Sequence, residues 1–219
     1  VTVDSDVEVL ADGATSARAN TTNSAGGFVG VGKSDGKSTQ TSTTGAYLAA
    51  GSLVEAGRDV TVRAVSLHTA DGNVRAETGG FAADVRANMT ANLNHTTTAE
   101  VRDGATVAAG GHVDVSTDAR VDADVESYAD GRGFGGGGYA NTIVTLGEVL
   151  SGQSEPTAAS KAARNEVLIG EGASITGGSF SARAESSKMN VNPEAHAIGA
   201  GFVAIGNAYS LIGVKAENL

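Results

Sequence analysis

Apolar and polar residues alternate with a period of two along most of this chain. Between residues 81 and 101 the odd positions are mainly Ala, Val, Leu and Met, and the even positions are mainly Asp, Arg, Asn and Thr. Successive side chains of a β-strand point to opposite faces, so the pattern predicts a long strand with one buried and one hydrated face. Residues 60–76 alternate similarly, although Val65 and Leu67 break the rule. Apolar positions at helical spacing never persist, which counts against an α-helical fold.

The alternating pattern recurs at a fixed interval. A Gly-Phe step opens each copy of the long alternating half, at Phe28, Phe81, Phe134 and Phe202; the first two intervals are 53 residues and the third is 68. Such repetition is typical of stacked architectures, in which each unit buries its apolar face against its neighbours. The sequence therefore predicts an all-β fold, a parallel β-solenoid (β-helix) of about four 53-residue repeats. Residues 1–219 are expected to form one segment with repeats at 1–59, 60–112, 113–179 and an incomplete 180–219.

Each repeat is expected to contain a strand, a Gly-rich turn, a longer strand and a short strand between Gly corners. No Gly or Pro interrupts the residues from Phe81 to Val101, so one wide flattened coil is predicted in place of two or three smaller rungs. In such a coil Val85 and Gly138, which are 53 residues apart, are direct neighbours. The phenylalanines of the Gly-Phe steps open the apolar phase, and we expect them to point inward and stack as a ladder.

The longer third interval holds 15 additional residues within about 148–165. Pro156 followed by Thr-Ala-Ala-Ser-Lys-Ala-Ala-Arg predicts a short inserted loop or helix, with any helix over roughly 154–165. A solenoid tolerates an insertion of this kind at a corner. Both a decorative loop and a specific functional element are compatible with it.

Composition narrows the class of protein. Aromatic residues are 4% of the chain, Trp is absent and Gly contributes 31 residues, so disorder is a rival to a folded array, and the regular alternation argues against it. The net charge of −10 makes nucleic acid and anionic membranes unfavourable partners. The absence of Cys excludes disulfides and thiol chemistry. No stretch reaches about 18 apolar residues, so no membrane insertion is expected. The chain begins inside a repeat marker, and we expect it to be a segment of a longer protein.

Candidate chemistry is sparse, and no catalytic, cofactor-binding or metal-binding residue is predicted. Gly131-x-Gly133-x-x-Gly136 matches a dinucleotide-binding string, but no helix is expected to follow it. Two of the histidines, His68 and His95, fall in the inward phase without the convergent spacing of a zinc site. An acidic run suggests Ca²⁺ but lacks the calcium-binding nonapeptide, so a solvated acidic face is favoured; it comprises Asp114, Asp118, Asp122, Asp124 and Glu126.

The recurring strings at 51–64 and 104–117 carry a resemblance to known proteins. Gly-Ala-Thr-Val-Ala-Ala-Gly-Gly-His-Val-Asp-Val-Ser-Thr at 104–117 resembles the repeats of large bacterial surface adhesins, the filamentous-haemagglutinin-like and autotransporter-like proteins with β-solenoid shafts. The likeness covers all four repeats. It implies export to the extracellular space or cell surface, adhesion or biofilm roles, and no cofactor.

These observations predict a non-catalytic structural or adhesive segment of an exported bacterial surface protein or fibre. The expected partners are neighbouring repeats or copies of the chain itself, joined end to end or laterally, and a surface glycan or a host or biofilm matrix. Two alternatives stay open: a carbohydrate-active β-helix enzyme of the polysaccharide lyase or hydrolase type, and a Ca²⁺-dependent extracellular binding module. Several such enzymes are parallel β-helices, but they usually expose aromatic residues to stack on sugars.

Overall fold

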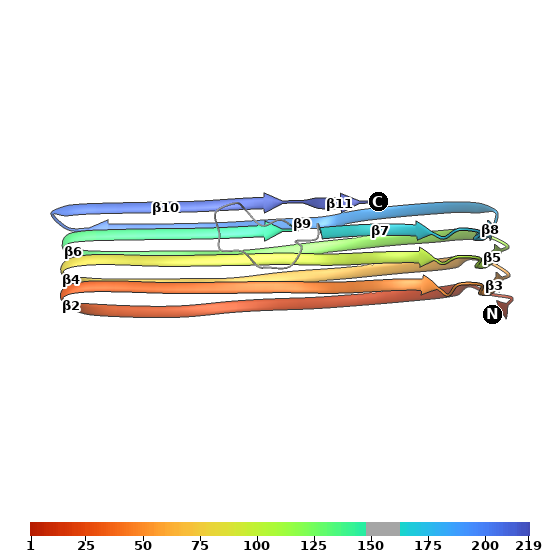
Figure 1. Cartoon of the computed structure of the whole chain (residues 1–219), viewed down its shortest axis with the longest axis horizontal. Helices are drawn as coiled ribbons and strands as arrows, with labels where there is room; N and C mark the ends of the chain where they lie inside the picture. Colours follow the sequence, from red (N-terminus) through yellow and green to blue (C-terminus); the bar gives the residue numbers. More distant parts are fainter. Residues whose placement is uncertain (148–162) are drawn as a thin grey trace.

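The computed structural model describes residues 1–147 and 163–219, and these form a flattened all-β solenoid of four stacked coils (Figure 1). The described residues contain no helix, so the predicted all-β parallel fold is confirmed. Most of the predicted insertion lies outside the described residues. Residues 163–165, the end of the range expected to contain any helix, instead begin a strand.

The four coils follow one plan. Each coil begins with a short strand at one narrow edge of the solenoid. An outgoing half then leads to the opposite edge, where the chain makes a U-turn, and a returning half leads back (Figure 1). Coil 1 contains β1 (Thr2–Val3) and β2 (Val7–Leu48), and coil 2 contains β3 (Leu53–Ala56) and β4 (Val60–Val101). Coil 3 contains β5 (Thr106–Ala109), β6 (His112–Leu146) and β7 (Ala163–Ile169). Coil 4 contains β8 (Ser174–Thr176), β9 (Ser179–Ala200), β10 (Val203–Val214) and β11 (Ala216–Asn218).

Within the described ranges, all pairing between coils is parallel. β2 pairs with β4 along its whole length at an offset of one repeat, and β4 pairs with β6 at the same offset. Val85 and Gly138 are direct partners in this register. The repeat is therefore one wide coil, as predicted, because smaller rungs would separate these residues by two or three layers.

Glycine corners close the coils at the end opposite the U-turns. The short strands form a separate four-stranded sheet in the order β1-β3-β5-β8. The residue that starts each corner is glycine with a left-handed φ of 66°, 67° and 69° at Gly51, Gly104 and Gly172. These are the corners predicted from the recurring Gly strings, and they need glycine because a Cβ disfavours this conformation.

Coil 4 departs locally from the register. It pairs with coil 3 at an offset of 68 residues in the short strands, for example Val107 with Ile175, but at 67 residues where Val113 pairs with Phe180. A register shift between Asp118 and Arg120 restores the larger offset. One residue missing at the corner of coil 4 is thus compensated by one extra residue in β9, a β-bulge.

The core lies between the outgoing and returning halves. The predicted inward residues of the central coils are buried, including Val60, Val85 and Met89. The apparent break at Val65 and Leu67 is not a break in phase, because Ser66 and His68 occupy the inward positions and Leu67 faces outward. The two halves lie close together: a Cβ on Gly72 would come within 2.1 Å of the Met89 Cε.

Candidate functional site

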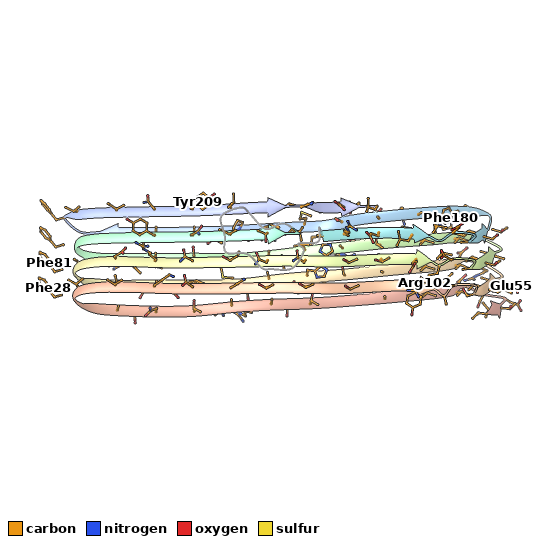
Figure 2. All side chains as sticks on the ribbon, viewed as in Figure 1. Phe28, Glu55, Phe81, Arg102, Phe180 and Tyr209 are labelled. Atoms are coloured by element: carbon orange, nitrogen blue, oxygen red, sulfur yellow. The ribbon has the colours of Figure 1, made fainter. Side chains whose placement is uncertain are left out.

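The Gly-Phe U-turns place a ladder of four phenylalanines along one narrow edge of the solenoid (Figure 2). Phe28, Phe81, Phe134 and Phe202 stack with ring-centroid separations of 5.1, 5.0 and 5.2 Å, and neighbouring rings are within 11° of parallel. Their exposed fractions are 76%, 52%, 53% and 83%. The predicted stack is therefore present, but the prediction that these side chains point inward is wrong.

The reason for the exposure is a change of phase at the U-turn. Inward residues are even-numbered in the outgoing half of coil 2, up to Thr78, and odd-numbered in the returning half, from Ala83 onward. The chain makes this change across residues 79–82, where it rounds the edge of the solenoid. Phe81 has the numbering of the inward set but sits at the bend, where no opposing sheet covers it.

We expect Phe81→Ala to lower the free energy of unfolding by about 1 kcal/mol. A fully buried phenylalanine would cost about 3–5 kcal/mol, but the stacked ring of Phe81 loses only its ladder contacts and a partial burial. Urea unfolding followed by circular dichroism measures the difference. A loss above about 3 kcal/mol would contradict the exposed position.

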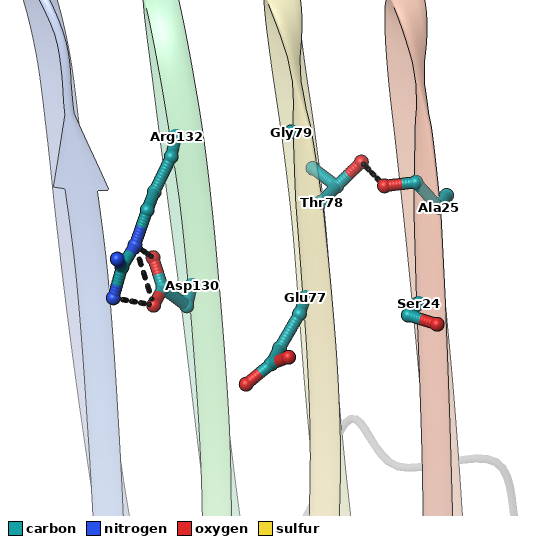
Figure 3. A pocket seen from close by; sticks show the side chains of 7 residues that line it. All are labelled: Ser24, Ala25, Glu77, Thr78, Gly79, Asp130 and Arg132. Atoms are coloured by element: carbon teal, nitrogen blue, oxygen red, sulfur yellow. Dashed lines mark hydrogen bonds and ion pairs between the residues drawn. The ribbon is translucent and has the colours of Figure 1, made fainter.

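A shallow hollow lies beside the U-turn on the outgoing side of the coils (Figure 3). Its lining comes from three consecutive coils. Ser24, Glu77 and Asp130 are register partners on these coils, and we call such a row of partners a column. Arg132 donates two Nε contacts of 2.9 Å and one Nη2 contact of 2.6 Å to the Asp130 carboxylate, whose side chain is largely buried. The Asp130 hydrogen bonds raise the pKa of Arg132. The carboxylates of Glu77 and Asp130 thus lie on neighbouring coils.

The second carboxylate of the hollow is also paired. Arg75 contacts Glu77 at 2.5 Å and places its guanidinium 4.4 Å from the ring centre of Tyr128. Across the coils, the Thr78 hydroxyl donates to the Ala25 carbonyl at 3.0 Å (Figure 3). The hollow therefore presents ion pairs and hydroxyls, groups suited to hydrogen bonding with a polar surface.

A polar layer crosses the core between its two apolar clusters. Its centre is a pair of stacked imidazoles, His68 and His95, with ring centroids 4.6 Å apart and only 2% and 5% exposed. Thr15 and Ser42 share hydrogen bonds of 2.9 and 3.2 Å with the His68 Nδ1. The inward phase expected for both histidines is confirmed.

Burial disfavours the charged form of both histidines. Burial lowers the pKa of His95 to about 4, with the neighbouring His68 adding to the effect, and burial also lowers the pKa of His68. The His68 Nε2 and the His95 Nδ1 have no hydrogen-bond partner within residues 1–147 and 163–219. In the same ranges no three His, Cys, Asp or Glu side chains converge as metal ligands.

The acidic run of coil 3 is only in part the solvated face that the sequence suggested, since Asp124 is exposed but Asp118 is buried. Asp118 is only 5% exposed and accepts hydrogen bonds from the Ser187 backbone at 3.0 Å and from Arg120 at 2.9 Å. Asp122 pairs with Lys188 at 2.6 Å. Desolvation opposes but does not outweigh these contacts at Asp118, so its pKa is lowered. The run joins coil 3 to coil 4, a partnership that alternation within one repeat could not reveal.

The dinucleotide-like string lies on the U-turn of coil 3, and it is flanked on both sides by residues of β6. Gly131, Gly133 and Gly136 are placed there by close backbone contacts, because a Cβ at each would come within 2.5 Å of a carbonyl oxygen of the neighbouring strand or coil. The helix needed to receive a pyrophosphate does not occur among the described residues. Those residues also include no helix that could span a membrane.

Comparison with protein-family models, with curated proteins and with solved structures finds no match for this chain.

Proposed function

We propose that this chain is a non-catalytic structural and adhesive segment of an exported bacterial surface protein, serving as a shaft at the cell surface. The observation that carries the proposal is the continuous parallel register, in which nearly every residue of β4 pairs with the coil on either side. In such an array stability comes from contacts between neighbouring units, so the structure extends by adding coils.

The outer edge of coil 1 supports an extension of this kind. Inward residues of coil 1 such as Val7 and Val9 are half-buried, whereas their column partners Val60 and Val62 are fully buried. A further coil against β2 would bury this row and pair its free backbone groups. Neighbouring repeats or a second copy of the chain fit that edge, since coils of this kind pair in one parallel register.

Duplication of the central repeat tests the shaft function. A variant with a second copy of residues 60–112 inserted after residue 112 is expected to fold, to melt at a higher temperature and to lengthen along the solenoid axis by about 4.8 Å. Small-angle X-ray scattering and thermal melts measure both quantities. A duplicated chain that unfolds or keeps the original length would contradict the proposal.

The carbohydrate-active enzyme and the Ca²⁺-dependent binding module can each be tested on the same purified chain. Cleavage of a soaked polysaccharide that is lost in the double variant Glu77→Gln and Asp130→Asn would favour the enzyme. A melting temperature that falls on addition of a chelator would favour the Ca²⁺-dependent module. The shaft function predicts neither.

A further inference from the structure

The U-turn edge of the solenoid carries an uncovered apolar strip. We call the column of Phe28, Phe81, Phe134 and Phe202 the Phe strip; beside it runs a second column of Val29, Ala82, Gly135 and Val203. Val29 and Val203 are more than half exposed. The labelled Phe28 and Phe81 project outward from the end of the coils (Figure 2).

The strip is also free of charge. The two columns of the strip contain no charged residue, and Asp84 and Arg132 are the two charged residues within the corresponding windows 26–31, 79–84, 132–137 and 200–205. The whole chain carries a net charge of −10, which makes two copies repel each other over most of their surfaces. The U-turn edge is where like-charged copies meet least repulsion.

The geometry of the rings indicates which kind of partner can cover the Phe strip. The faces of Phe81 and Phe134 are covered by the rings of the adjacent coils at about 5 Å, so the strip presents ring edges. A sugar stacks on an exposed ring face, which the inner rings do not offer. A second Phe strip has the same spacing of about 5 Å, so its apolar ring edges can pack against these edges coil by coil and remove both from water.

We propose that the Phe strip is a lateral self-association surface, along which two copies of this chain pack side by side. This inference builds on the proposed shaft function but uses a different surface from the coil edges that extend the array. With about 150–250 Å² per phenylalanine, the exposed parts of four rings amount to roughly 500 Å² per copy. Two such strips bury at most about 1,000 Å², a size typical of weak interfaces.

The size of the interface fixes the expected behaviour. The contact area grows with the number of coils, so association is weak for these four coils and tighter for longer arrays. In a dilution series the 219-residue chain is expected to show a reversible equilibrium between single and paired solenoids by sedimentation velocity. The chain with the duplicated repeat is expected to pair at lower concentration.

Two variants test the assignment of the surface. Phe81→Ser combined with Phe134→Ser is expected to weaken pairing at least about tenfold. Leu53→Ser combined with Leu168→Ser is the matched control, because both leucines are about as exposed but lie away from the U-turn edge. Circular dichroism confirms that both variants are folded. Equal pairing in the Phe variant and the control would overturn the proposal and leave the end-to-end shaft function untouched.

The lack of native Cys allows a direct proximity test. Ala82→Cys is expected to give crosslinked dimers with a bismaleimide that spans about two coil spacings, roughly 10 Å. Thr106→Cys, at the opposite end of the coils, is expected to stay monomeric under the same conditions. Crosslinking through Thr106→Cys alone, or binding of the intact strip to neutral phosphatidylcholine vesicles without self-association, would overturn lateral pairing.

Discussion

Replacing Gly133 with alanine is expected to lower the free energy of unfolding by about 3 kcal/mol or more. A Cβ at this position would lie 2.0 Å from the carbonyl oxygen of Gly80 and 3.1 Å from its carbonyl carbon. Both are backbone atoms of the adjacent coil, so the clash is relieved only by opening the ladder between coils. Glycine occupies the same place in every coil, at Gly27, Gly80, Gly133 and Gly201.

Gly135→Ala is the matched control for this prediction. It lies two residues further along the same U-turn, and a Cβ there has no heavy atom within 4 Å. Its column partner in coil 2 is Ala82, which shows that alanine fits. Urea unfolding of both variants measures the difference, and a loss of stability below about 1 kcal/mol for Gly133→Ala would show that the coils separate easily at the turn.

Mild acid is expected to destabilise the solenoid by about 3 kcal/mol between pH 6.5 and pH 4. The pKa of His95 is lowered from an ordinary value of 6.5 to about 4 by burial in the polar layer. In this range the unfolded chain binds a proton that the folded chain does not, so stability is present above pH 6.5 and is lost as the pH falls toward 4. His68, whose pKa is lowered for the same reason, acts in the same direction.

The pH profile separates the histidines from the carboxylates. The pKa of Asp118 and that of Asp122 are lowered from 3.8, so their contribution is present above pH 3.8 and is lost at lower pH. His95→Ser, which introduces the residue that coil 1 has in this column, is expected to flatten the profile between pH 6.5 and 4. His196→Gln, at an exposed histidine of coil 4, serves as the control. An unchanged slope in His95→Ser would contradict the assignment.

Much of the fold could be predicted because the same alternation and the same Gly-Phe step recur in every repeat of the sequence. Alternation over some 20 residues without a turn signal required a wide coil, and the 53-residue interval required that Val85 and Gly138 be neighbours, as they are. The glycine corners followed from their recurrence. The candidate site was harder to predict, because it depends on contacts across coils and around bends that a period of two does not describe.

Individual residues show where that limit lies. Phe81 has the numbering of an inward residue, yet the change of phase at the U-turn places it outside. The alternation predicts that the Asp118 side chain faces solvent, yet coil 4 covers it and the Ser187 backbone N–H donates a hydrogen bond to it. The comparison of Val113 with Phe180 and of Phe134 with Phe202 did contain a signal, since the two intervals differ by one residue and indicate the bulge in β9.

The strand content, the length of the coil and the register follow from the sequence, because backbone pairing at a fixed interval depends only on local alternation and repetition. The tertiary structure alone decided which side chains are covered at the U-turn, that His68 and His95 stack across the core, and which charges on coil 3 meet partners on coil 4. These outcomes depend on which surfaces the stacked and facing halves bring together, and burial and electrostatics act on that arrangement in space.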